Sequence, residues 1–136
     1  MRSLILPMSA AALALSGCAM TPSESARAAE AQSASRAALG QHLAGLSPGA
    51  TQDCMDPHQS SSLKAYGPTL VYTVNRGLVY VNETGGGCEA VERGDILVTR
   101  SPTGRLCRGD IGTTVMSGSH VPSGSCSLGA FTVYHK

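Results

Sequence analysis

Five cysteines carry most of the chemistry that this sequence offers. A thiol can be acylated, oxidised to a disulfide, bound to a metal or used as a nucleophile, and its surroundings decide among these fates. Cys18 stands alone near the N-terminus, directly behind the small residues Ser16 and Gly17. The other four are spread over the C-terminal part of the chain: Cys54, Cys88, Cys107 and Cys126. The two groups therefore call for separate explanations.

The first 17 residues have the pattern of an export signal. Arg2 gives a positive start, and the apolar stretch that ends at Leu15 is shorter than the roughly 20 residues needed to span a bilayer. Leu15-Ser16-Gly17-Cys18 resembles the lipobox of bacterial lipoproteins, which implies cleavage before Cys18 and acylation of Cys18 with chains such as palmitate. In that family, Ala19 rather than Asp after the cysteine implies sorting to the outer membrane, facing the periplasm. An ordinary secretory signal followed by a chance cysteine is the alternative.

Once Cys18 is acylated, the remaining four cysteines predict two disulfides, because exported chains commonly pair an even number of cysteines. No C-x-x-C pair exists, so the spacing indicates neither a zinc site nor a thioredoxin-like redox centre. Three pairings are possible. We expect Cys88 with Cys107, which closes a hairpin-sized loop, and Cys54 with Cys126, which ties the two ends of the domain.

The other polar residues form no recognisable catalytic or metal-binding pattern. Asp95, Asp110 and His120 are the candidates for acid–base chemistry, but their spacing assembles no site. Arg108-Gly109-Asp110 has the sequence of an integrin-binding tripeptide and is interpreted as an ordinary turn. The triple glycine 85–87 lacks the strand-to-helix context of a phosphate-binding loop. We therefore expect a non-enzymatic protein with no cofactor and no bound metal.

Charge and aromatic content exclude nucleic acid as a partner. Without Arg2, the chain has 9 basic residues, from the total of 10, against 9 acidic residues, so its formal net charge is zero. It has no Trp, 1 Phe and 4 Tyr. Nucleic-acid binding needs a basic surface and commonly stacking aromatic side chains, and this sequence supplies neither.

Composition divides the chain into a signal peptide at 1–17, the lipidated cysteine with an Ala/Ser-rich spacer at 18–50, and a domain at 51–136. In the spacer, Thr21-Pro22-Ser23-Glu24 has the pattern of a helix N-terminal capping box, and Leu39, Leu43 and Leu46 recur at helical spacing. The spacer is either this helix or a disordered tether. Because the segment is mostly small residues, we expect it to bury almost nothing against the domain.

The domain is predicted to be mainly β. Leu70–Val74 and Leu78–Asn82 alternate on either side of Asn75-Arg76-Gly77, which predicts a hairpin with a three-residue loop. A second hairpin is expected from segments 96–100 and 105–108 around the turn 101–104. Two further strands are expected at 111–116 and 131–134, separated by a loop at 117–125, with one helical turn at 89–93. The resulting fold class is a small antiparallel sheet, sandwich or partly open barrel held by two disulfides.

The order of the cysteines, together with the segments 106–110 and Cys126-Ser127-Leu128-Gly129-Ala130-Phe131, resembles a family of proteobacterial four-cysteine lipoproteins of unknown function that end in C-x-L-G-x-F. The resemblance covers the whole domain and implies a fold and a compartment but no activity.

We expect a lipid-anchored, non-catalytic binding or structural module of the cell envelope. It would be held at the membrane by the lipid on Cys18 and would bind an envelope protein through its sheet face or its long loop. The alternative is a small periplasmic inhibitor, because Ser117-Gly118-Ser119-His120 is similar to the Ser-Gly loop of lipid-anchored lysozyme inhibitors.

Overall fold

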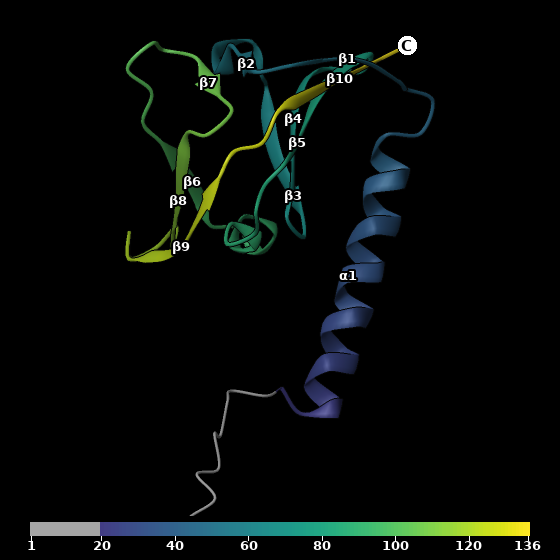
Figure 1. The fold of residues 1–136 in the computed structure, drawn as a ribbon, viewed down its shortest axis with the longest axis vertical. Helices are drawn as coiled ribbons and strands as arrows, with labels where there is room; N and C mark the ends of the chain where they lie inside the picture. The colour runs from purple at the N-terminus through teal and green to yellow at the C-terminus, as the bar shows by residue number, and fades with distance from the viewer. Residues whose placement is uncertain (1–19) are drawn as a thin grey trace, which may run out of the picture.

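A computed structural model describes residues 20–136, which form one helix followed by a mainly β domain of antiparallel sheets (Figure 1). The predicted signal peptide and Cys18 lie outside the described residues. The predicted fold class is confirmed, and the three sheets do not close into a barrel within the described part of the chain.

The largest sheet has five strands in the order β1-β10-β5-β4-β3, and its neighbours are all antiparallel. Its strands are β1 (Ser47–Gln52), β3 (Ser62–Tyr66), β4 (Thr69–Asn75), β5 (Leu78–Glu83) and β10 (Phe131–His135). The predicted hairpin is the pair β4 and β5, but its predicted three-residue loop is wrong. Asn75 still pairs with Leu78, so only Arg76 and Gly77 form the turn. The Asn75 side chain supports this turn by accepting a hydrogen bond from the Gly77 amide at 2.8 Å.

A three-stranded sheet has the order β6-β8-β9, from β6 (Ile96–Thr99), β8 (Ile111–Val115) and β9 (Pro122–Ser127). A two-stranded sheet pairs β2 (Cys54–Met55) with β7 (Leu106–Cys107). The second predicted hairpin is wrong. The turn from Ser101 to Gly104 forms, but β6 pairs with β8, and β7 pairs with β2.

The disulfides join Cys54 to Cys107 and Cys88 to Cys126, so both predicted pairings are wrong although the number of disulfides is right. The prediction relied on loop length, whereas strand pairing decides the partners. The pairing of β2 with β7 sets Cys54 directly opposite Cys107, with their Cα atoms 4.0 Å apart. The second disulfide ties the segment after β5 to β9.

The five-stranded sheet is covered on both faces. On one face Leu70, Tyr72 and Phe131 pack with Met55, Leu106 and Leu128 from the side of the two smaller sheets. On the other face, the buried side chains are Val71, Val79 and Val81. They pack against partly buried leucines at the C-terminal end of the helix α1 and just after it. The short helices η1 (Pro57–Gln59) and η2 (Glu89–Arg93) lie in connections, and η2 is the expected single helical turn.

The spacer contains the helix α1 (Pro22–His42), which begins with the predicted capping box of Thr21 and Glu24. Residues 20–34 are exposed throughout. Further along, Leu39, Leu43 and Leu46 pack against the valine cluster, and the Ser35 side chain is buried. The expectation that the spacer buries almost nothing is therefore wrong for its C-terminal half. The strand β1 also begins at Ser47, inside the range that composition assigned to the spacer.

Candidate functional site

Among the described residues, exposed large hydrophobic side chains gather on one face of the three-stranded sheet and at its end. Successive side chains of a strand point to opposite faces, so Leu97 packs on the core while Ile96 and Val98 point outward. Ile96 pairs with Val115, and Val98 pairs with Thr113, which places the outward residues of β6 and β8 side by side. We call the outward side chains of Ile96, Val98, Ile111 and Val115 the apolar face.

Exposure identifies this region as unusual. Six large hydrophobic side chains are exposed among residues 20–136, and five of them lie in β6, in β8 or at the turn between β8 and β9. They are Ile96, Val98, Ile111, Met116 and Val121, each between 43% and 57% exposed. Single exposed hydrophobic residues are normal, but a cluster of this kind marks an interaction surface.

A shallow groove of about 580 Å³ crosses the apolar face. Its lining includes Val98, Ile111 and Val115 together with Gly109 and Thr113, and its two charged residues are Arg100 and Asp110. The groove thus offers a hydrophobic floor with one positive and one negative group, which suits an apolar partner surface with few charges.

The apolar face rests on a rigid support. On the inner side of β8, Thr114 is completely buried, and its Oγ1 lies 2.9 Å from the Ser123 hydroxyl. Ser123 in turn donates a hydrogen bond to the Asp95 carboxylate. Beneath Gly112 lies the buried disulfide of Cys126. The strands are therefore fixed in place, and a partner would meet a preformed surface.

The candidates for acid–base chemistry have structural roles. Asp110 accepts a hydrogen bond from the Cys107 amide at 2.8 Å and closes the turn that contains the integrin-like tripeptide, so the interpretation as a turn is confirmed. Asp95 holds Ser123, as described above. His120 has a positive φ of 57° in the exposed turn between β8 and β9.

The glycine-rich segment before Cys88 packs its backbone directly against the backbone of β9. A Cβ atom on Gly87 would collide with the Ser125 carbonyl, and one on Gly124 would collide with the Gly87 carbonyl. The Gly87 amide donates to the Glu89 carboxylate at 2.9 Å. These glycines let the chain cross β9 closely enough for Cys88 to reach Cys126.

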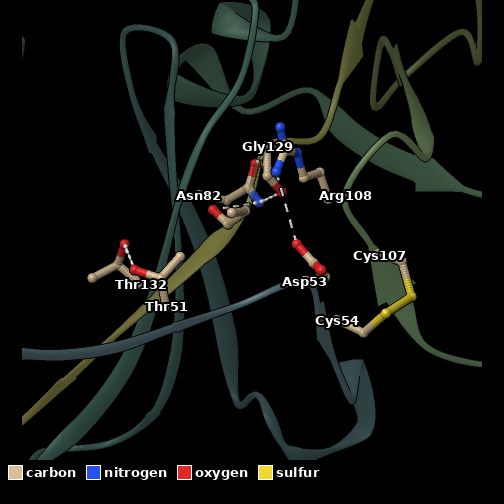
Figure 2. Close-up of polar contacts among 9 residues, drawn as sticks. Thr51, Asp53, Cys54, Asn82, Cys107, Arg108, Gly129 and Thr132 are labelled. Carbon is tan, nitrogen blue, oxygen red and sulfur yellow. Dashed lines mark hydrogen bonds and ion pairs between the residues drawn. A yellow bond between two sulfur atoms is a disulfide. The ribbon is translucent and has the colours of Figure 1, made fainter.

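The C-x-L-G-x-F segment is explained by packing. Cys126 forms a disulfide, Leu128 is 2% exposed, and Phe131 is fully buried. Gly129 passes so close to the Glu83 carbonyl that a Cβ would overlap it, and its amide donates to the Asn82 Oδ1 at 3.0 Å (Figure 2). The residues of this segment thus have structural roles.

A second hollow, of about 880 Å³, lies between the exposed half of α1 and the loops at Pro68 and Gly85. On the helix side it is lined mostly by small residues, including Ala28 and Ala31. At its inner end Glu92 joins the helix to the domain, because its carboxylate accepts from the Ser35 hydroxyl at 2.9 Å and from the Gly67 amide at 3.0 Å.

His42, the last residue of α1, also holds the helix to the sheet. Its Nδ1 lies 2.6 Å from the Tyr66 hydroxyl, and the two rings meet edge to face. Burial lowers the pKa of His42, and the positive charge of Lys64 lowers it further. Burial also raises the pKa of Tyr66, with a smaller contribution from the negative charge of Glu92.

Sequence reasoning missed the apolar face and the role of Asn82. The signal for the face was the run Ile96-Leu97-Val98, which is apolar on both sides of a strand although only one side can meet the core. Asn82 ends a predicted strand, and nothing in the sequence places its side chain beside Gly129.

Comparisons of the chain with protein families, with curated proteins and with solved structures find no match. Within residues 20–136, no helix is long and apolar enough to cross a membrane. The same residues contain no group of three or more His, Cys, Asp or Glu side chains that could hold a metal ion.

Proposed function

We propose that this protein is a lipid-anchored envelope lipoprotein that binds a protein partner through the apolar face and performs no catalysis itself. The observation that carries the proposal is the clustering of five exposed large hydrophobic residues on and beside one small sheet. A soluble domain that leaves such a surface uncovered loses hydrophobic free energy, and covering it with a partner recovers about 25 cal/mol per Å².

The geometry of α1 supports the anchoring half of the proposal. The described chain begins at Met20, two residues after Cys18, and the helix leads from there to the domain (Figure 1). Its 21 residues correspond to about 30 Å at 1.5 Å per residue. Residues 20–34 contribute nothing to the core, as expected of a spacer between a membrane and a domain.

Fatty-acid labelling tests the anchor. Cells that produce the full chain are grown with a clickable fatty acid, and the Cys18→Ser variant is compared with the wild type. We expect label on the wild type and none on the variant, which should also keep its signal segment. Equal labelling of both proteins would refute lipidation at Cys18.

Affinity capture from envelope extract tests the binding half. The wild-type chain is compared with Val98→Glu, which places a charge on the apolar face, and with Met20→Glu, which changes the one exposed large hydrophobic residue that lies elsewhere in the described chain. We expect Val98→Glu to lose the captured partner and Met20→Glu to keep it. Capture that is insensitive to Val98→Glu would place the binding surface elsewhere.

The inhibitor alternative rests on one observation. The segment Ser117–His120 forms an exposed turn at the end of the three-stranded sheet, flanked by Met116 and Val121, which are 49% and 53% exposed. A protruding turn beside an apolar face is a shape that can enter an enzyme cleft. Inhibition of lysozyme by the wild-type chain, lost on deletion of Gly118 and Ser119, would favour this function over the binding module.

A further inference from the structure

We propose that the partner of the apolar face is a second copy of this chain, so that two three-stranded sheets pack face to face about a two-fold axis. This inference rests on the proposed function, because it names the occupant of the same surface.

The size of the surface fits a symmetric dimer. The five exposed hydrophobic side chains, three on the apolar face and two at the adjoining turn between β8 and β9, are each about half exposed and together present on the order of 500 Å² of apolar area. Interfaces are about 60% apolar, so this area corresponds to roughly 800 Å² per partner. That is the standard size of a specific interface, whereas small ligands or short peptides need far less.

The charges of the surface are self-complementary. The groove on the apolar face contains one positive residue, Arg100, and one negative residue, Asp110. In a two-fold dimer the same patch of both copies forms the interface. The interface would then contain two copies of Arg100 and two of Asp110, and so equal numbers of positive and negative charges. The chain without Arg2 has 9 basic and 9 acidic residues, and two copies therefore approach without net repulsion.

The chain cannot cover this face with its own described elements. The helix α1 packs on the opposite side of the five-stranded sheet, and β6 pairs only with β8 (Figure 1). A second three-stranded sheet matches the surface in width, and two sheets that pack face to face lie about 10 Å apart with interdigitated side chains.

The side chains of the face are suited to association. Ile96, Val98, Ile111 and Val115 are β-branched, and such residues have few χ1 rotamers even when exposed. Ordering them at an interface therefore costs less conformational entropy than ordering long flexible side chains. Because β8 is held from beneath by Thr114 and the buried disulfide, the backbone is also preorganised.

The first experiment measures the mass of the unlipidated chain Met20–Lys136, which contains every described element, by light scattering over a range of concentrations. We expect a dimer. Ile111→Glu should raise the dimer dissociation constant at least about a hundredfold, because the two-fold axis buries the new charge twice. Met20→Glu is the matched control and should dimerise as the wild type does. Circular dichroism checks that both variants keep the fold.

The second experiment distinguishes this inference from the proposed function. Val98→p-benzoyl-phenylalanine is placed in the full chain in cells and irradiated, with the same replacement at exposed Ala31 as the control. An adduct of two copies from position 98 supports the inference. An adduct with a different protein, together with a monomeric purified chain, overturns the second copy but leaves the proposed function standing. No adduct from position 98 and a monomeric chain overturn both.

Discussion

Asn82 serves as the hydrogen-bond partner for the segment that leads into β10. Its Nδ2 donates to the Gly129 carbonyl at 2.7 Å, and its Oδ1 accepts from the Gly129 amide (Figure 2). The side chain is completely buried, so these bonds also remove the cost of burying an amide without partners. One side chain thereby fixes the position of Gly129 against the sheet.

The close approach at Gly129 predicts a large effect of a small change. Gly129→Ala places a Cβ against the Glu83 backbone carbonyl, and backbone cannot move aside as a flexible side chain can. We expect a loss of about 3 kcal/mol or more in the free energy of unfolding, measured by chemical denaturation. Gly118→Ala is the control, since nothing lies within 4 Å of its Cβ position, and it should stay within about 0.5 kcal/mol. Equal effects of the two would contradict the close approach.

At Tyr72, by contrast, a substitution is expected to leave the stability of the fold unchanged or to raise it. Its hydroxyl is buried in the core beside Phe131 and has no hydrogen-bond partner among residues 20–136, and burial raises its pKa. An unpartnered buried hydroxyl costs about 1–3 kcal/mol, so Tyr72→Phe should leave the melting temperature unchanged or raise it. In Tyr66→Phe the bond to His42 is lost, and the stability should fall by about 0.5–1.5 kcal/mol. A comparable fall for Tyr72→Phe would show that its hydroxyl does have a partner.

At the scale of elements, α1 is attached to the sheet by contacts at its C-terminal end. The leucines Leu39 and Leu43 supply apolar burial, while Ser35 and His42 supply hydrogen bonds to Glu92 and Tyr66. The part of the helix that precedes Ser35 has no such contacts and is exposed. The attachment therefore depends in part on a titratable group.

The His42 contact predicts that acid weakens the attachment. Because burial and Lys64 lower the pKa of His42 in the fold, the unfolded chain binds the proton more readily, with a pKa of about 6.5. The contribution of neutral His42 to the free energy of unfolding is therefore fully present above pH 6.5 and is lost as the pH falls below that value. We expect the melting temperature to drop between pH 7.5 and 5.5, and to drop less in His42→Gln. His120→Gln removes an exposed imidazole and should keep the wild-type slope; if His42→Gln also kept it, His42 would not be the cause.

Local pattern was sufficient to predict the elements that local contacts form. The capping box at Thr21 and the hairpin of β4 and β5 were both predicted, because each depends on residues that are neighbours in the chain. The strand β9 was missed, since Pro122-Ser123-Gly124-Ser125 has the composition of a loop and is extended only because it pairs with β8.

Partners that are distant in sequence were beyond prediction. The pairing of Cys54 with Cys107 follows from the contact between β2 and β7, two strands of two residues each with no periodicity to detect. The apolar face had the same difficulty, because an apolar strand gives no sign of which of its sides the core will cover. Only the register of Ile96 against Val115 shows that both point outward.

At the scale of the molecule, the protein is built in three layers. The five-stranded sheet is central, with α1 on one face and the two smaller sheets on the other (Figure 1). The disulfide Cys54–Cys107 joins the two strands of the two-stranded sheet, and the disulfide Cys88–Cys126 ties β9 to the segment after β5. The apolar face lies on the side of the three-stranded sheet that is opposite to Leu97 and the core.

The layered arrangement predicts that two truncations of the spacer differ sharply. A chain that begins at Glu30 loses only exposed residues and should melt within a few degrees of the chain from Met20. A chain that begins at Thr51 loses Leu39, Leu43, Leu46 and most of β1, which uncovers Val71, Val79 and Val81. Each fully buried valine contributes about 1.5–3 kcal/mol, so the loss approaches the 5–15 kcal/mol of a typical domain. Calorimetry measures both, and a Thr51 chain as stable as the Met20 chain would show that α1 is a tether that contributes nothing to the core.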